Sequence, residues 1–368
     1  MTKTPRQNDL AIVISDLSSG GAQRVVATLA NHWASLGRSI AVVTLADPDL
    51  DYFTLDQRIV RLVVGEAGLS HSVLGAIIGN IRRILALRRT LRQVNAPTVV
   101  AFVGATNVLT IMAAAGLGIR VFISERNDPA RQSLGRMWNF LRRLFYKRAH
   151  LATANSQSAI TTMSTFAPAA KLRLVHNPIL VPDPRPQVDP EPLILNVGRL
   201  VHQKAQDVLL EAFAIVTAEA PDWRLAIVGE GPDGSALKSR ASTLGIADKI
   251  EFVGRADPWP YYTRATIFAL PSRYEGTSNA LLESMAMGIP PVISDTSGGG
   301  LDVVSDGFSG LIAPADDPSA LADAFRRLIT DPDMRRRIGR AAADSVANLN
   351  LETVAAEWET VLGLSAQC

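Results

Sequence analysis

The pattern of apolar residues in the first 45 positions constrains the fold of this chain most strongly. The continuous apolar run at 10–14 is typical of a parallel strand buried on both faces, and a Ser-Ser-Gly-Gly loop follows it at 18–21. Apolar side chains then recur at helical spacing over 25–33, and a second apolar run covers 40–45. A strand, a glycine loop, a helix and a strand within about 30 residues predict a βαβ unit.

The same alternation continues along the chain. Further strand-length apolar runs lie at 99–103, 121–124, 151–154, 172–175, 193–197, 223–228, 250–253, 266–270, 291–293 and 310–312. Segments with helical spacing lie at 74–91, 106–115, 134–145, 207–217, 235–244, 279–287, 319–329 and 332–346. Strands that alternate with helices predict a parallel, doubly wound sheet in each half of the chain.

Five prolines divide the chain into two domains. They fall at 182, 184, 186, 190 and 192, and proline at this density excludes a helix or a central strand. We predict an amino-terminal domain at 1–181, a linker at 182–192, a second domain at 193–346 and a final segment at 347–368. Two such sheets joined by one linker predict a cleft, with ligands at the carboxyl ends of the strands.

Composition excludes several classes of protein. The 368 residues suffice for two domains, and 47% hydrophobic with 20% charged residues fit an ordinary globular chain. A net charge of +2 argues against a nucleic-acid-binding protein. The single cysteine, Cys368, excludes a disulfide framework and a cysteine-based metal site within the chain. Because Asp16 cuts off the first apolar run, we expect no signal peptide.

One uncharged stretch, 98–119, is long enough to span a bilayer. The alternative is a strand that Gly104 ends, followed by a helix that Thr106 or Asn107 caps and a second short strand. The βαβ pattern on both sides favours the second interpretation.

Two glutamates flank a glycine turn at 275–283. Glu275 precedes Gly276, and Glu283 lies on the helix that follows. The N–H groups at the start of a helix, together with its dipole, suit a diphosphate or sugar hydroxyls. A carboxylate early in that helix could accept two hydrogen bonds from a ribose diol. The alternative is that Glu275 caps a turn and Glu283 is a solvated helix residue.

A second polar loop, 198–207, directly follows a predicted strand. Its cations Arg199 and Lys204 could neutralise a diphosphate and stabilise the charge of a leaving nucleoside diphosphate, or they are ordinary surface cations. The loop at Gly20 and Gly21 would let a ligand approach the backbone closely, although tight turns use the same residues. It lacks the full G-x-G-x-x-G pattern, which weakens the case for a dinucleotide cofactor.

In combination, these segments resemble the retaining glycosyltransferases of family 4, which have the GT-B fold. The similarity covers nearly the whole chain and is carried by 18–25 (SSGGAQRV), 124–127 (SERN), 176–178 (HNP), 196–200 (NVGRL), Lys204 with Asp207, 228–232 (VGEGP), 252–254 (FVG), 275–283 (EGTSNALLE) and 286–290 (AMGIP). The resemblance implies an α/β protein with two Rossmann-like domains facing a cleft. It also implies that a helix at 351–362 crosses back to the amino-terminal domain.

The resemblance implies a role for each candidate residue. Arg199 and Lys204 would hold the donor diphosphate, Glu283 would bind the ribose, and Glu275 would hold the transferred sugar and back the reaction centre. The residues that would contact the nucleotide-sugar are Gly20, Gly21, Arg199, Lys204, Gly254, Arg255, Glu275, Gly276, Thr277, Ser278, Asn279 and Glu283.

Gly254 and Arg255 would face the base in this arrangement, and Gly20 and Gly21 would approach the diphosphate from the other domain. Arg126 is a departure, because many relatives have a histidine near the sugar in the segment that resembles 124–127. Arginine cannot accept a proton. Either Arg126, which we count among the catalytic candidates, contacts the donor or acceptor directly, or the segment aligns one residue away.

The resemblance further implies a reaction that retains the anomeric configuration. Front-face attack is expected, with the leaving diphosphate helping to take the acceptor's proton, so that catalysis consists mostly of positioning and charge stabilisation. No metal would be needed. Aspartates at 47–51 and 331–333 have the spacing of a hard-cation site, but both groups adjoin a proline, which favours solvated turns.

Two basic segments bear on the acceptor. At 82–92 and 131–148, arginines are interleaved with apolar residues, as in helices that lie on anionic membranes or in ordinary helices whose apolar stripe faces the core.

Relatives that begin with Ser-Gly-Gly-Ala often act on polyprenyl-diphosphate-linked sugars at the cytoplasmic leaflet. We therefore predict a UDP-sugar donor carrying a hexose or N-acetylhexosamine and a lipid-linked or polysaccharide acceptor. The protein would be cytoplasmic and peripheral to the inner face of the plasma membrane. The alternatives are an isomerase like the UDP-sugar 2-epimerases and a non-catalytic nucleotide-sugar-binding module.

Overall fold

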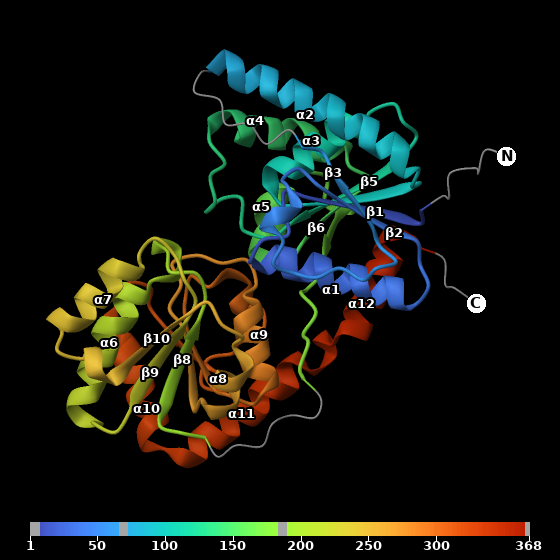
Figure 1. Cartoon of the computed structure of the whole chain (residues 1–368). Helices are drawn as coiled ribbons and strands as arrows, with labels where there is room; N and C mark the ends of the chain where they lie inside the picture. Colours follow the sequence, from blue (N-terminus) through green and yellow to red (C-terminus); the bar gives the residue numbers. More distant parts are fainter. Residues whose placement is uncertain (1–7, 66–72, 183–189, 365–368) are drawn as a thin grey trace. The chain divides into compact units, whose positions relative to one another are not determined.

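The computed structural model describes residues 8–65, 73–182 and 190–364 and divides the chain into two compact units (Figure 1). Unit 1 comprises residues 1–178 and 351–368, and unit 2 comprises residues 179–350. Each unit contains one parallel sheet with helices packed against it. The two doubly wound sheets expected from the sequence are therefore confirmed.

Within the described residues, the sheet of unit 1 has seven parallel strands in the order β3-β2-β1-β4-β5-β6-β7. They are β1 (Leu10–Ile14), β2 (Ile40–Thr44), β3 (Val60–Val63), β4 (Thr98–Phe102), β5 (Arg120–Glu125), β6 (Leu151–Ala154) and β7 (Leu172–Leu174). Every residue of β1, β2 and β4 is buried, which is why these strands are continuous apolar runs. The strand order reverses between β1 and β4, and such a switch point is where open α/β sheets bind ligands.

Helices cover both faces of this sheet. They are α1 (Gly21–Ser35), α2 (Val73–Val94), α3 (Gly104–Ala114), α4 (Arg136–Phe145), α5 (Gln157–Ser164) and α12 (Leu351–Leu362). Figure 1 shows α2, α3 and α4 on one side of the sheet, with α1 and α12 on the other. The return of the carboxyl-terminal helix to unit 1 is confirmed, because Trp358 of α12 is buried with its ring 5.7 Å from that of Phe102. The uncharged stretch 98–119 forms β4 and α3, and none of the described helices is long and apolar enough to cross a membrane.

In the described part of unit 2, six parallel strands are arranged in the order β10-β9-β8-β11-β12-β13. They are β8 (Leu193–Val197), β9 (Arg224–Val228), β10 (Ile250–Gly254), β11 (Ile267–Leu270), β12 (Pro291–Ser294) and β13 (Leu311–Ala313). The helices are α6 (Gln206–Glu219), α7 (Gly234–Thr243), α8 (Trp259–Arg264), α9 (Asn279–Ala286), α10 (Pro318–Thr330) and α11 (Pro332–Val346). Here the order reverses between β8 and β11, so the loops after these two strands lie at the expected ligand position.

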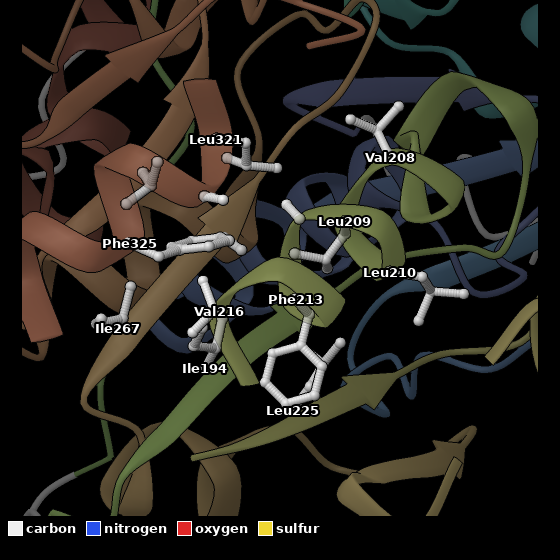
Figure 2. Close-up of a cluster of buried hydrophobic side chains, with 14 of the residues drawn as sticks. Ile194, Val208, Leu209, Leu210, Phe213, Val216, Leu225, Ile267, Leu321 and Phe325 are labelled. Atoms are coloured by element: carbon white, nitrogen blue, oxygen red, sulfur yellow. The ribbon is translucent and has the colours of Figure 1, made fainter. Parts of the chain in front are cut away.

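The main core of unit 2 lies between its sheet and the helices α6 and α10. Figure 2 shows the rings of Phe213 and Phe325 among aliphatic side chains from the strands, including Ile194 and Leu225. Both phenylalanines are fully buried. Replacing a phenylalanine in such a position by alanine typically costs about 3–5 kcal/mol, so this core fixes the strands whose loops carry the candidate site.

Short elements complete the two units. The 3-10 turns are η1 (Pro48–Leu50), η2 (Tyr146–Arg148), η3 (Ala169–Lys171), η4 (His202–Lys204), η5 (Ala247–Lys249), η6 (Gly298–Gly300) and η7 (Ala347–Leu349). Helix α3 begins at Gly104, earlier than the expected cap at Thr106 or Asn107. The reason is that Val103 has a φ of 73° and turns the chain directly from β4 into the helix.

Candidate active site

The carboxyl edge of the unit 2 sheet gathers most of the residues predicted from the sequence. The loops after β10, β8 and β11 lie along one edge because all three are parallel strands of the same sheet. These loops and the start of α9 carry Arg199, Lys204, Gly254, Arg255, Glu275, Gly276, Thr277, Ser278, Asn279 and Glu283. The two polar segments that the sequence singled out therefore belong to one site.

Lys204 and Glu275 connect these two segments directly. The ammonium group of Lys204 donates a hydrogen bond to Oε1 of Glu275, and the hydroxyl of Ser272 donates to the same oxygen at 2.9 Å. Glu275 is buried, whereas Arg199 is exposed. A Cβ on Gly198 would lie 3.3 Å from Cε of Lys204, so a glycine leaves room for this lysine side chain. The site thus holds a paired, largely buried lysine and an open arginine on the same loop.

Arg273 also connects the two loops, and sequence reasoning missed it. Its guanidinium donates to both carboxylate oxygens of Asp207, at 3.1 and 2.8 Å, and to Asp316 at 2.7 Å. Its backbone N–H donates to the carbonyl of Gln203 at 2.8 Å. Burial of Asp207 works to raise its pKa, but the hydrogen bonds and charge of Arg273 outweigh this and hold the pKa below its usual value. The signal was present, since Arg273 lies two residues before Glu275 and Asp207 was already singled out with Lys204.

Helix α9 presents its amino terminus at this edge. Ser278 is the N-cap residue, and in the described part of the chain its side chain makes no capping hydrogen bond. Thr277 and Ser278 are buried. The first N–H groups of a helix have no partner within the helix, and with the helix dipole they favour an anion. The geometry of the loop and helix therefore suits a phosphate or the hydroxyls of a sugar.

Glu283 is buried one turn into α9. Its Oε2 accepts a hydrogen bond from the hydroxyl of Tyr262 at 3.0 Å. The alternative of a solvated helix residue is therefore wrong for Glu283. A buried carboxylate that is held by a tyrosine can still accept hydrogen bonds through its remaining lone pairs.

A run of three glycines, Gly298 to Gly300, supports the Glu275 loop, and it was also missed. Gly298 has a φ of +53°, and a Cβ there would collide with the carbonyl oxygen of Glu275. The N–H of Gly299 donates to the carbonyl of Gly276 at 2.7 Å. Both the conformation and the close approach require glycine at position 298. Three consecutive glycines after a predicted strand were the available signal.

Gly254 and Arg255 lie at the far end of the same edge. Gly254 has a φ of +74° at an irregularity in β10, and its carbonyl accepts from the N–H of Gly229 at 2.8 Å. Nη1 of Arg255 is 3.5 Å from a carboxylate oxygen of Glu230, and both side chains are well exposed. An exposed cation beside a bent backbone leaves this end of the edge accessible.

In unit 1, the loop after β1 ends at Gly20, the N-cap residue of α1, and Gly21 is the first residue of that helix. Asp16 organises this loop, because its Oδ1 accepts from the N–H and hydroxyl of Ser18 and from the amide of Gln23. Burial works to raise the pKa of Asp16, but hydrogen bonds from Ser18, Ser15 and Gln23 lower it below its usual value overall. A loop fixed in this way presents the backbone at Gly20 and Gly21 at the carboxyl end of β1.

Arg126 follows β5 and is enclosed by aromatic rings. Its guanidinium carbon lies 4.9 Å from the centre of the Phe102 ring and 5.6 Å from that of Trp358, and Nη1 donates to Oδ1 of Asn177 at 2.7 Å. Burial lowers the pKa of Arg126 to about 9. Among the described residues, its Nε and Nη2 have no hydrogen-bond partner. The neighbouring Glu125 pairs with Arg142 instead, at 3.3 Å.

The two aspartate groups serve as caps and ion-pair partners. Asp47 accepts from the N–H of Asp49, and Asp331 caps α11 by accepting from the N–H of Met334. Asp51 pairs with Arg61, and Asp333 pairs with Arg336. Within the described ranges, no group of three or more histidine, cysteine or carboxylate side chains is placed to hold a metal ion.

Comparison with protein families decides the class of the protein. Residues 19–180 match the model described as "Glycosyltransferase Family 4", and residues 182–345 match the model described as "Glycosyl transferases group 1". The chain belongs to glycosyltransferase family 4. As a member of this family of retaining hexosyltransferases, the protein uses a nucleotide-sugar donor.

Individual relatives of this glycosyltransferase are similar along most of their length. It is 26% identical, over 95% of its length and 96% of the relative, to the "GalNAc-alpha-(1->4)-GalNAc-alpha-(1->3)-diNAcBac-PP-undecaprenol alpha-1,4-N-acetyl-D-galactosaminyltransferase" of Campylobacter jejuni. It is 24% identical, over 94% of its length and 97% of the relative, to an uncharacterized glycosyltransferase of Haemophilus influenzae. The family 4 glycosyltransferases that resemble it include bacterial enzymes of glycan and lipopolysaccharide synthesis.

Similar solved structures confirm the GT-B fold. The structure of Anabaena Alr3699/HepE in complex with UDP and glucose aligns with a TM-score of 0.80 at 18% identity, covering 97% of this glycosyltransferase and 100% of that chain. The lipopolysaccharide outer core galactosyltransferase WaaB aligns with a TM-score of 0.73 at 18% identity, covering 96% and 99% of the two chains.

Proposed function

We propose that this glycosyltransferase transfers a hexose or N-acetylhexosamine from a UDP-sugar to a lipid-linked or polysaccharide acceptor, with retention of configuration and without a metal ion. The observation that carries the proposal is the ion pair of Lys204 with Glu275, which lies on loops beside the exposed Arg199 and the amino terminus of α9. Cations, helix N–H groups and carboxylates on one edge of a sheet match the phosphates and hydroxyls of a nucleotide-sugar.

The negative charge of the leaving UDP must be stabilised by nearby cations. Arg199 and Lys204 contact the diphosphate and stabilise the negative charge that grows on it, a role a metal ion fills in other enzymes. Glu283 accepts hydrogen bonds from the ribose hydroxyls. Gly254 and Arg255 border the base. From unit 1, Gly20 and Gly21 offer backbone N–H groups to the diphosphate.

The transferred sugar lies against Glu275 and the loop that follows it. Glu275 accepts hydrogen bonds from the sugar hydroxyls. The side chains of Thr277, Ser278 and Asn279 both donate hydrogen bonds to these hydroxyls and accept hydrogen bonds from them. The acceptor hydroxyl oxygen attacks the anomeric carbon from the face that UDP leaves. As the bond to the diphosphate oxygen breaks, the acceptor proton passes to that diphosphate. Arg126 acts as a cation near the substrates and takes no proton.

Two relatives support the choice of substrates. Anabaena Alr3699/HepE was crystallised with UDP and with UDP-glucose, which supports a UDP-sugar donor here. The name of the Campylobacter jejuni relative specifies an undecaprenyl-diphosphate-linked glycan, which supports a lipid-linked acceptor. With such an acceptor, the enzyme works in the cytoplasm at the inner face of the plasma membrane and has an anionic membrane surface as a partner. The family models describe transferases, so the isomerase alternative lacks comparable support.

The test is UDP and GDP release by the purified full chain across a panel of UDP- and GDP-sugars, with EDTA present and with or without a short polyprenyl-diphosphate sugar. We expect release with one UDP-sugar only when acceptor is present, and NMR of the product should show the anomeric configuration of the donor. Lys204→Ala should lower the rate about 10²–10³-fold. Sugar interconversion without net UDP release would instead indicate an isomerase, and tight binding without turnover would indicate a binding module.

A further inference from the structure

Charge is distributed very unevenly along this chain. Residues 67–182 contain fifteen lysines and arginines but only two acidic residues, whereas the whole chain has a net charge of +2. Both acids are buried: Glu125 is the last residue of β5, and Asp128 follows shortly after it. Cations at the other end of β5 and its neighbours therefore have no acidic residue of this segment beside them.

A cavity of about 400 Å³ lies at that other, amino-terminal edge of the unit 1 sheet. Its lining comes from the turn between α3 and β5 and from the residues that directly precede β6 and β7. Besides small residues, it includes the apolar Ile111 and Phe145 and the basic Arg120, Arg148, His150 and Lys171. None of the described residues that line the cavity is acidic. Its volume is within the range of small-molecule sites.

Two of the cations at this cavity are held by neutral groups, which fix them in place without cancelling their charge. Nζ of Lys171 donates to the carbonyls of Lys147 at 3.1 Å and Ala149 at 2.8 Å. Nη2 of Arg120 donates to the hydroxyl of Thr98 at 2.7 Å. Because an ammonium group has three N–H bonds and a guanidinium has five, both side chains keep N–H groups for a ligand.

Arg148 and His150 complete the basic set from exposed positions. The guanidinium carbon of Arg148 lies 4.8 Å from the centre of the Phe145 ring, and the centre of the His150 ring lies 5.1 Å from that of Phe122. Contact with an aromatic ring positions a planar side chain without using its N–H groups. Arg148 and His150 can therefore both donate to a ligand in the cavity.

The carboxyl terminus of helix α3, beside the cavity, is compensated. Such a terminus has a partial negative charge that would repel an anion. Here Nη1 of Arg88 on α2 donates to the carbonyls of Ala113 at 2.9 Å and Ala115 at 2.6 Å. In the turn that follows, Gly116 and Gly118 each have a φ of +72°, and a Cβ at either position would meet no atom within 4 Å. The turn therefore leaves space for a ligand.

We propose that this cavity binds a small, soluble phosphomonoester, with the phosphate on the basic side chains and the body of the molecule against Ile111 and Phe145. A phosphomonoester carries a charge of about −1.5 to −2 at pH 7 and three acceptor oxygens. These match three cations and an imidazole better than the two oxygens of a single carboxylate do. The cavity lies at the opposite edge of the sheet from Gly20, Gly21 and Arg126, so it is separate from the proposed nucleotide-sugar site and does not rest on the proposed function.

The experiment is calorimetric titration of the full chain with phenyl phosphate in about 0.15 M NaCl, with saturating UDP present to fill the proposed donor site. We expect the wild type to bind phenyl phosphate more tightly than inorganic phosphate, which lacks the apolar body. Phenol, which lacks the phosphate, should not bind.

The basic side chains are tested by substitution. Arg148→Gln should weaken the binding of phenyl phosphate about tenfold and Arg148→Gln/Lys171→Gln about a hundredfold, because each change removes a charge-assisted hydrogen bond. Since Arg148 is exposed, its replacement should leave the melting temperature nearly unchanged. The matched control is Arg82→Gln/Arg89→Gln, which removes two charges from exposed positions of α2 outside the cavity and should bind normally.

Three outcomes would overturn the proposal. The wild type would fail to bind phenyl phosphate, or the two double variants would lose affinity equally, which would indicate attraction to the cationic surface as a whole. In the third, Lys204→Met would abolish binding while Arg148→Gln retained it, which would place the phosphate in unit 2. Titration with UDP alone reports on the proposed function separately.

Discussion

Replacement of Arg273 by methionine tests whether one side chain holds the two loops of the candidate site in unit 2 in register. Arg273 donates to both oxygens of Asp207, to Asp316 and to the carbonyl of His202. Methionine keeps much of the aliphatic packing and removes every one of these hydrogen bonds. Lys204 is the last residue of η4 on one loop, and Glu275 lies two residues after Arg273 on the other. The loss of Arg273 should therefore loosen the ion pair that connects the two loops.

The expected loss in the free energy of unfolding follows from how exposed the paired side chains are. The Arg273 side chain is 16% exposed and that of Asp207 41%, so this bidentate pair contributes about 1.5–3 kcal/mol to the free energy of unfolding. The Asp316 carboxylate is mostly exposed and adds at most about 1 kcal/mol. For a unit of this size, a total of about 2–3 kcal/mol lowers the melting temperature by roughly 5–10 °C.

Activity should fall by more than stability explains. A displacement of a catalytic group by about 1 Å can cost about a hundredfold in rate, so we expect kcat/KM of Arg273→Met to fall about 10- to 100-fold at 25 °C, where the variant remains folded. Arg273→Lys retains the charge without the planar fork and should be intermediate. The measurements are differential scanning fluorimetry and initial rates of UDP release. A lower melting temperature with unchanged kcat/KM would refute the positioning role.

Three further predictions concern other parts of the fold. The folded-state pKa of Asp207 lies below its unfolded value. The contribution of the Arg273–Asp207 pair to the free energy of unfolding is therefore full above about pH 4 and is lost as the pH falls further. The melting temperatures of wild type and Arg273→Met should differ by a constant amount between pH 6 and 8 and should converge in acid. Arg142→Met removes the ion-pair partner of the buried Glu125 carboxylate, which keeps the hydrogen bond from the Tyr146 hydroxyl, and should destabilise unit 1 by about 3–5 kcal/mol in urea titrations, whereas Glu125→Gln/Arg142→Met should recover part of that loss. Gly298→Ala should raise KM for the donor more than tenfold by displacing the Glu275 loop, and an unchanged KM would show that the collision is relieved without moving it.

The strands and most helices could be predicted because burial leaves a direct pattern in the sequence. Strands buried on both faces appear as short apolar runs, and the predicted 10–14 and 193–197 coincide with β1 and β8. The helix at 351–362, which the family resemblance implied, coincides with α12. Elements without this pattern were missed: β3 is a four-residue edge strand, α5 is rich in serine and threonine, and α8 has only six residues with a proline near its start.

The site was predicted as a set of residues but not as a set of contacts. Both loops could be assigned to the carboxyl edge, yet their ion pair depends on β8 and β11 being neighbours, which the alternation of strands and helices does not determine. Arg126 shows the same limit, because the Trp358 ring over it comes from the other end of the chain. The basic helices were left with two interpretations, and α2 has both features: one apolar stripe on the core and another in solvent.

Calorimetric titration with UDP tests the donor site most directly, because it requires neither the right sugar nor the right acceptor. We expect the wild type to bind UDP in the presence of EDTA. Lys204→Met, which removes the proposed diphosphate contact, and Glu283→Gln, which weakens the proposed acceptance from the ribose, should each bind about ten- to a hundredfold more weakly. Lys249→Met is the matched control, since Lys249 lies before β10 at the opposite edge of the same sheet. Wild-type affinity in all three variants would contradict the assignment of this edge of unit 2 as the nucleotide-sugar site, and selective loss in the first two would support it.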